Sequence, residues 1–126
     1  MFAPLLAGLL LGGAASSASA GPYTRLQVLL PGETAAPGTA SGKTGAPRAQ
    51  TSGVPFAVTI RACDSGWNTV AGITNALQTL SSDASATLPS TTQLVNGTAS
   101  VTVRFNAGGT FTVYAHDQSD GTIPDG

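Results

Sequence analysis

The sequence predicts an all-β domain with the layered architecture of a sandwich or a barrel. Short runs of alternating apolar and polar residues recur along the chain, and no segment sustains the 3.6-residue period of a helix. Sixteen glycines and eight prolines among 126 residues supply frequent turns. Only 9% of the residues are charged, well below the roughly 25% of an ordinary soluble domain. This length leaves room for one domain.

Residues 1–20 have the pattern of a signal peptide. A short apolar run at residues 5–11 is followed by small residues, and Ala18-Ser19-Ala20 fits the cleavage pattern that would leave Gly21 first. No Lys or Arg precedes the run, and the alternative is a disordered Ala-rich N-terminus. The run is shorter than the roughly 20 apolar residues of a membrane span. We therefore expect a secreted or cell-surface protein without a membrane span after cleavage.

Residues 21–53 are expected to hold the first strand and a long connection. The strand candidate is residues 24–30, in which Leu26, Val28 and Leu30 share one face. Residues 34–52 are rich in Gly, Pro and Thr and have almost no large apolar residue. They predict an extended connection on the surface, with room for a short edge strand.

Residues 54–126 form the expected body of the domain. The clearest strand is 54–63, in which Phe56, Val58 and Ile60 alternate with other residues that face away from the core. Residues 74–81 are a less regular candidate, and 86–88 and 93–95 are short ones. Strands at 98–106 and 110–115 are joined by a Gly-Gly turn, which predicts an antiparallel hairpin. Between 93–95 and 98–106, Asn96-Gly97 is a signal for a tight turn.

The alternating positions define the predicted core. Their side chains are large and apolar, and they occupy one face of each predicted strand. The set is Leu26, Val28, Phe56, Val58, Ile60, Leu80, Leu88, Val101, Val103, Phe105, Phe111 and Val113.

An ordered series of short motifs resembles the bacterial immunoglobulin-like (Big/invasin-like) repeats of large exported proteins. The series is Asp64, Trp67-Asn68, Ser81-Ser82-Asp83, Leu88-Pro89, Asn96-Gly97-Thr98, and Gly109-Thr110 through Asp117. The resemblance implies an immunoglobulin-like antiparallel β-sandwich, used in tandem arrays as stalks or adhesive parts. It also implies neighbouring immunoglobulin-like domains of the same polypeptide as partners. The family's sandwich closes with one more strand, which this chain is expected to lack, either as a fragment or with an open edge.

Catalytic residues are nearly absent from the sequence. His116 is the sole histidine, and no G-x-S-x-G elbow supports a Ser-His-Asp arrangement. Cys63 is the sole cysteine, so the chain cannot form an internal disulfide. A small residue within a strand is the simplest interpretation of this cysteine, and pairing with another chain is the alternative. We expect a protein that is not an enzyme.

Three aspartates are the candidates for a metal site. Asp64, Asp83 and Asp117 each end a strand candidate, and calcium takes six to eight oxygen ligands, including carboxylates. The competing interpretation is that each aspartate caps its own turn. Calcium is thus the one cofactor for which the sequence offers candidate ligands, and no other is expected.

The remaining candidates concern binding. Trp67 follows a turn and serves either as a platform for a sugar or as a plug at the open end of the core. Tyr114 and His116, with Arg61 and Arg104, are expected to point outward. Basic residues are scattered, which argues against nucleic acid. The leading hypothesis is a structural spacer module; the alternatives are a module that binds carbohydrate or protein, and a small secreted enzyme.

Overall fold

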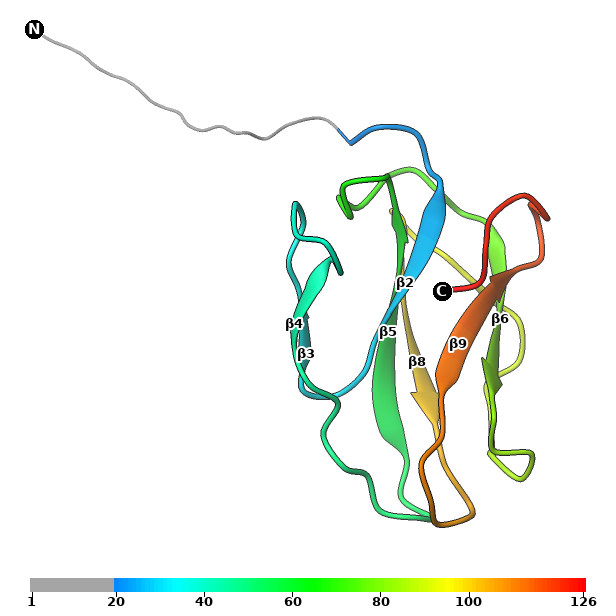
Figure 1. Cartoon of the computed structure of the whole chain (residues 1–126). Coiled ribbons are helices and arrows are strands. Elements are labelled where there is room, and N and C mark those ends of the chain that lie inside the picture. The colour runs from blue at the N-terminus through cyan, green and yellow to red at the C-terminus, as the bar shows by residue number, and fades with distance from the viewer. Residues whose placement is uncertain (1–19) are drawn as a thin grey trace, which may run out of the picture.

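Two antiparallel sheets pack face to face in the part of the chain that the structure describes, residues 20–126 of a computed structural model (Figure 1). The first sheet has the order β2 (Arg25–Leu29), β5 (Phe56–Cys63), β8 (Thr98–Val103). The second has the order β7 (Thr92–Gln93), β6 (Ala76–Ser81), β9 (Val113–Asp117). A separate hairpin pairs β3 (Glu33–Ala35) with β4 (Lys43–Gly45). The chain is thus an immunoglobulin-like β-sandwich, without a helix in residues 20–126.

The inner face of the first sheet confirms the alternation expected from the sequence. Val28 lies opposite Ile60, and Val58 lies opposite Val101. All four side chains are buried in the core, and Ile60 and Val58 are fully inaccessible. The predicted signal peptide, apart from Ala20, lies outside the described residues.

The inner face of the second sheet differs from the prediction. Leu77 is fully buried, whereas Leu80 is half-buried and lies on the other face of β6. The reason is that β6 keeps strict alternation, so Leu77 and Thr79 point inward together. Leu94 and Ile123 also belong to the core, although neither lies in a strand.

The predicted hairpin of residues 98–106 and 110–115 is wrong. β8 pairs with β5 in the first sheet, and β9 pairs with β6 in the second. The intervening residues cross from one sheet to the other, where the Phe105 and Phe111 rings pack at a centroid distance of 5.3 Å. A glycine pair in the sequence shows that the chain turns, but it does not show which strand the next segment joins.

The shorter predicted elements are partly confirmed. Residues 86–88 make only an isolated bridge between Thr87 and Arg104, and in place of the strand expected at 93–95 the structure has β7, which spans only residues 92–93. The tight turn is present, because Asn96 and Gly97 have φ of 52° and 74° and Val95 bridges Thr98. Two consecutive positive φ values are what a type I′ turn requires.

The β3–β4 hairpin covers part of the outer face of the first sheet. It lies almost entirely in the connection predicted at residues 34–52, where the structure forms two short paired strands and leaves the other residues without strand structure. Gln27 of β2 donates from Nε2 to the carbonyl of Gly42 at 2.8 Å, and its Oε1 accepts from Arg61. Arg61 also binds Thr69 Oγ1 through Nε at 2.9 Å. Arg61 lies on the outer face of β5, as expected, but the hairpin covers it and leaves it only 9% exposed.

Candidate functional site

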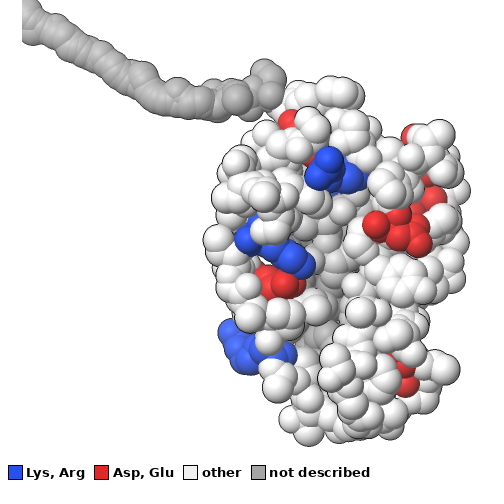
Figure 2. Space-filling model, viewed as in Figure 1, with Lys and Arg blue, Asp and Glu red and all other residues white. Residues whose placement is uncertain are grey.

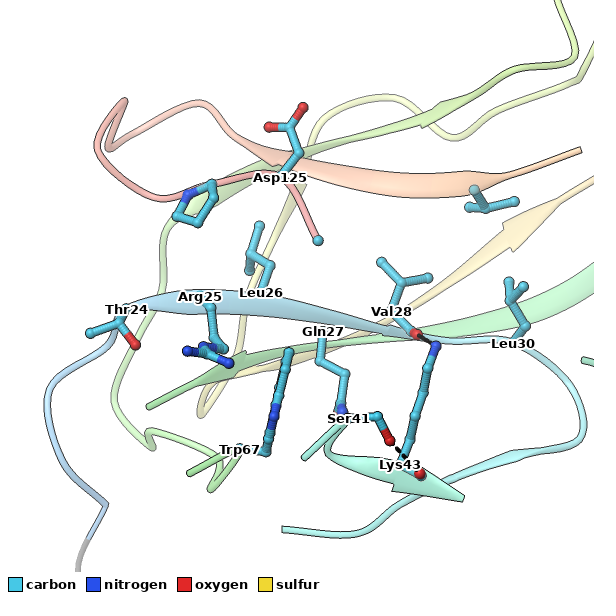
Figure 3. Close-up of a pocket in the computed structure, with 13 residues that line it drawn as sticks. Thr24, Arg25, Leu26, Gln27, Val28, Leu30, Ser41, Lys43, Trp67 and Asp125 are labelled. Atoms are coloured by element: carbon cyan, nitrogen blue, oxygen red, sulfur yellow. Dashed lines mark hydrogen bonds between the residues drawn. The ribbon is translucent and has the colours of Figure 1, made fainter. Parts of the chain in front are cut away.

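A groove of about 420 Å³ separates β2 from β9 on one side of the sandwich. Its apolar lining includes Leu26, Val28 and Leu30 on the side of the first sheet and Val113 on the side of the second. Figure 3 shows Leu26 and Val28 pointing into this space, toward the C-terminal segment, whereas Gln27 points to the opposite side of β2. The groove is thus a slot between the two layers of the core.

Both strands that border the groove are edge strands. β2 is paired on one side with β5, and β9 is paired on one side with β6. One rung is already formed on the other side of β9. Gly126 N donates to the carbonyl of Ala115 at 3.0 Å, and Ala115 N donates to the carbonyl of Gly126 at 3.2 Å. Such a reciprocal pair belongs to an antiparallel ladder, so a strand added in this register would run antiparallel to β9.

The rim of the groove carries charges of opposite sign on its two sides. Arg25 and Lys43 line it on the side of β2 and the hairpin, and Asp125 lines it on the other. Figure 2 shows the same separation, with most acidic atoms of this face across the hollow from the basic ones. Lys43 Nζ donates to the backbone carbonyl of Val28 at 3.2 Å and pairs with Glu33 at 3.0 Å. The side chain therefore shields part of β2, as lysines commonly do at sheet edges.

Trp67 lies at this rim, outside the core between the sheets. The Arg25 guanidinium stacks over its ring at 4.4 Å from the centroid. Figure 3 shows Arg25 and Ser41 on opposite sides of the indole, and a Cβ on Gly42 would overlap the ring. Trp67 has a φ of 66° and donates from Nε1 to the carbonyl of Ala40 at 3.2 Å. Its role is to hold the hairpin against the first sheet, which neither interpretation from the sequence anticipated.

A second hollow, of about 360 Å³, lies beside the connection from β8 to β9. Its lining includes the rings of Phe56, Phe105 and Phe111, which contact one another in tilted pairs at 5.2 and 5.3 Å. Two prolines and one glycine of the surrounding loops also line it. These rings extend the core to the end of the sandwich.

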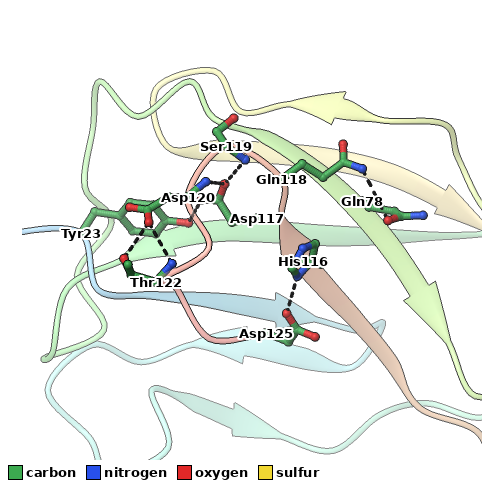
Figure 4. A network of polar contacts seen from close by, with 9 residues as sticks. All are labelled: Tyr23, Gln78, His116, Asp117, Gln118, Ser119, Asp120, Thr122 and Asp125. Carbon is green, nitrogen blue, oxygen red and sulfur yellow. Dashed lines mark hydrogen bonds and ion pairs between the residues drawn. The ribbon is translucent and has the colours of Figure 1, made fainter.

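Asp117 is the most buried of the three candidate calcium ligands, at 1% exposure. Its Oδ2 accepts from the Tyr23 hydroxyl at 2.6 Å and from Asn75 Nδ2 at 2.8 Å. Its Oδ1 accepts from the amides of Ser119 and Asp120 at 2.8 and 3.0 Å (Figure 4). Burial by itself raises the pKa of Asp117, but the bonds from Tyr23, Asn75 and the two amides outweigh it and lower the pKa. Burial and the bond to Asp117 raise the pKa of Tyr23.

Asp64 accepts hydrogen bonds in the same manner. Its carboxylate accepts from Gly21 N at 2.7 Å, and from Gly66 N and Asn68 N at 2.9 Å each. The bonds from Gly21 and Asn68 hold the pKa of Asp64 below its usual range. Asp64 directly follows β5 in the first sheet, and Asp117 ends β9 in the second. Both lie at the end of the sandwich where the described chain begins.

Asp83 lies at the other end of the sandwich. It follows β6, and its Oδ1 accepts from the Ser85 amide and hydroxyl at 2.9 and 2.7 Å. The bonds from Ser85 lower its pKa against the opposing effect of burial. The structure therefore does not bring the three aspartates together, and residues 20–126 contain no group of three metal-ligating acidic, His or Cys side chains. The geometry of each matches the turn-capping interpretation.

The remaining candidate residues lie on β9 and at the end of β5. Tyr114 and His116 alternate with the buried Ala115 and are half-exposed on the outer side of β9. Figure 4 shows His116 facing Asp125, and His116 Nδ1 lies 2.8 Å from Asp125 Oδ1. Cys63 is fully buried as a free thiol, and burial raises its pKa. A buried thiol with a raised pKa is a poor nucleophile.

Tyr23 and Asn75 are structural partners that sequence reasoning missed. They reach Asp117 across sequence separations of 94 and 42 residues. The sequence offered one signal for this network: Tyr23, an aromatic residue with a hydroxyl, stands directly before the first predicted strand. In the described residues, no helix is long and apolar enough to cross a membrane.

Comparisons with known proteins show a fold and no family. No protein family matches the sequence, and no curated protein does. Two solved structures of β-glucuronidase from Parabacteroides merdae are similar to this chain. The first has a TM-score of 0.58 at 12% identity, and the second, with glycerol in its active site, has 0.56 at 14%. Each match covers 95% of this chain and 13% of the glucuronidase chain. At such identity the likeness establishes the β-sandwich alone.

Proposed function

We propose that this protein is a non-catalytic structural module, a spacer within a secreted or cell-surface bacterial protein built as a tandem array. We further propose that the groove between β2 and β9 takes an extended strand from a neighbouring immunoglobulin-like domain. The observation that carries this proposal is the pair of strand edges facing one apolar slot, with one antiparallel rung already formed at Ala115. Backbone pairing at an exposed edge supplies affinity, and alternating side chains fill the pocket.

Two further features support a structural role. In the glucuronidases the matched region is a small part of a much longer chain, so the same architecture occurs there within a larger protein. The candidate titratable groups of the described residues are also engaged in structural bonds: the three aspartates cap turns, and His116 pairs with Asp125. Export is expected from residues 1–20.

The alternative of a binding module is best supported for a protein partner at the same groove. A sugar platform needs an exposed aromatic face. Both sides of the Trp67 ring are occupied, by Arg25 and by the hairpin. A peptide strand requires no free aromatic ring, so the geometry favours protein over carbohydrate.

A peptide titration tests the groove. Trp67 is the sole tryptophan and lines the groove, so its fluorescence reports occupancy. We expect a peptide of alternating Val and Thr residues to change the emission saturably. The same peptide with alternate prolines should not, because proline lacks the amide that pairs with a strand edge.

Two variants locate the binding. Val113→Lys places a charge in the apolar lining and should weaken binding at least about tenfold, which corresponds to about 1.4 kcal/mol. Thr102→Lys is the matched control, because Thr102 is exposed on β8, away from the groove. Strand addition at the groove would be refuted if the proline peptide bound as tightly as the Val-Thr peptide. It would also be refuted if the two variants weakened binding of the Val-Thr peptide equally.

A further inference from the structure

The backbone nitrogen of Gly21 is a hydrogen-bond donor to the Asp64 carboxylate. It donates to Asp64 Oδ2 at 2.7 Å, across 43 residues of sequence. The other donors to this carboxylate are the amide of Gly66 and the amide and side chain of Asn68, at 2.9 to 3.3 Å. All of these groups are neutral. The ion pairs of residues 20–126 join Lys43 to Glu33 and His116 to Asp125, so Asp64, only 5% exposed, has no cation paired with it in this part of the chain.

The same nitrogen belongs to the peptide bond at which the signal peptide is expected to be cut. We propose that cleavage between Ala20 and Gly21 creates the missing cation, and that the new α-ammonium of Gly21 pairs with Asp64 and locks the N-terminal arm in place. This inference rests on the export that the proposed function includes. Hydrolysis by a signal peptidase consumes one water, breaks the Ala20–Gly21 C–N bond, and leaves a carboxylate on Ala20 and an ammonium on Gly21.

The arm formed by residues 21–23 connects the two sheets. Gly21 binds Asp64, which directly follows β5, and Tyr23 binds Asp117, the last residue of β9. Two hydrogen bonds from three consecutive residues therefore reach both layers at one end of the sandwich. Strengthening the first bond restricts the arm that makes the second.

The new positive charge on Gly21 should stabilise the fold. A hydrogen bond between an ammonium and a carboxylate is roughly twice as strong as one between neutral groups. The carboxylate also raises the pKa of the α-ammonium above its usual value of about 7.7–8.0. The added stability is therefore complete below the usual pKa and is lost as pH rises through the raised one.

A protease cut in the full chain tests the lock directly. Residues 15–20 are replaced by the recognition sequence of a site-specific protease that cleaves before glycine, so that the cut leaves Gly21 first. We expect the melting midpoint at pH 7 to rise by a few degrees after the cut. The rise should disappear well above the raised pKa of the ammonium.

The matched control moves the ammonium by one residue. The recognition sequence replaces residues 14–19 and is combined with Ala20→Gly, so the cut leaves one extra glycine ahead of Gly21 and displaces the charge by about 3.8 Å. We expect no rise there, and none in Asp64→Asn. If Asp64→Asn does not fold, NMR titration of the α-ammonium still tests the pairing. The pKa of the α-ammonium should be raised in the cut chain that begins at Gly21 and ordinary in the control with one extra glycine. Equal midpoints or equal pKa values in the two cut chains would overturn the lock.

The cleavage step has its own measurement. N-terminal sequencing of the exported natural chain should begin at Gly21. Another first residue would refute this maturation, even if the engineered cut shows the pairing. Failure of peptide binding would refute strand addition at the groove, without changing the first residue of the exported chain or the pairing of Gly21 with Asp64.

Discussion

Removing the Tyr23 hydroxyl tests the polar network that joins the N-terminal arm to β9. Tyr23→Phe deletes the 2.6 Å bond to Asp117 Oδ2, while Asn75 and two amides remain bound to that carboxylate. A hydrogen bond to a charged group contributes about 1.5–3 kcal/mol. At roughly 4 °C for each kcal/mol in a domain of about this size, the melting midpoint should fall by roughly 6–12 °C.

The control for this change is Tyr114→Phe. Tyr114 is half-exposed on the outer side of β9, and its hydroxyl has no hydrogen-bond partner among the described residues. Thermal and urea unfolding of both variants at pH 7 measure the difference. The deficit of Tyr23→Phe should also shrink as pH falls through the lowered pKa of Asp117, because a protonated Asp117 gains less from the bond. Equal stability of the two variants would refute the structural role of the network.

The other predictions concern packing, the hairpin and the aspartates. Leu77→Ala should cost about 2–5 kcal/mol, and Leu80→Ala clearly less, because only Leu77 is fully buried; similar losses in urea unfolding would contradict the placement of β6. Gly42→Ala should cost about 1–3 kcal/mol more than Gly38→Ala, since both have positive φ but only Gly42 abuts Trp67; equal midpoints would argue against that contact. The lowered pKa values of the three aspartates predict a melting midpoint that falls on acidification below about pH 4, and a constant midpoint from about pH 5 to about pH 2 would oppose this. Calcium and a chelator should give the same midpoint, and a rise with calcium would instead support the metal site expected from the sequence.

The strands of the first sheet could be predicted because their alternation is long. Residues 56–63 keep period 2 through Phe56, Val58 and Ile60, and a one-residue shift would move all three to the other face of the sheet. The core-facing residues of the second sheet were harder to predict. Its central strand is only six residues long, and the prediction placed Leu80 on the core face, where the structure places Leu77.

Pairing partners could not be predicted from local patterns. The Gly108-Gly109 pair predicted a hairpin, yet the chain crosses between sheets at that point. Contacts such as Tyr23 with Asp117 join residues 94 positions apart, and no local spacing encodes them. The groove could not be predicted either, because the two strands that border it, β2 and β9, lie near opposite ends of the described chain.

The aspartates show where a local pattern was informative. Each follows or ends a strand, and each accepts a backbone amide two residues ahead, from Gly66, Ser85 or Ser119. This is the general turn chemistry of Asp. Whether three such turns converge depends on the ends of the sandwich that they occupy, which the sequence does not reveal.

Chemical-shift mapping of backbone amides during the Val-Thr peptide titration tests whether a strand adds at the groove. If the groove accepts an added strand, the largest changes should fall on residues 26–30 and 113–115. The amide of Ala115 should respond as its existing bond to Gly126 is strengthened or replaced. Changes concentrated on β8, or no saturable change at all, would contradict strand addition at the groove.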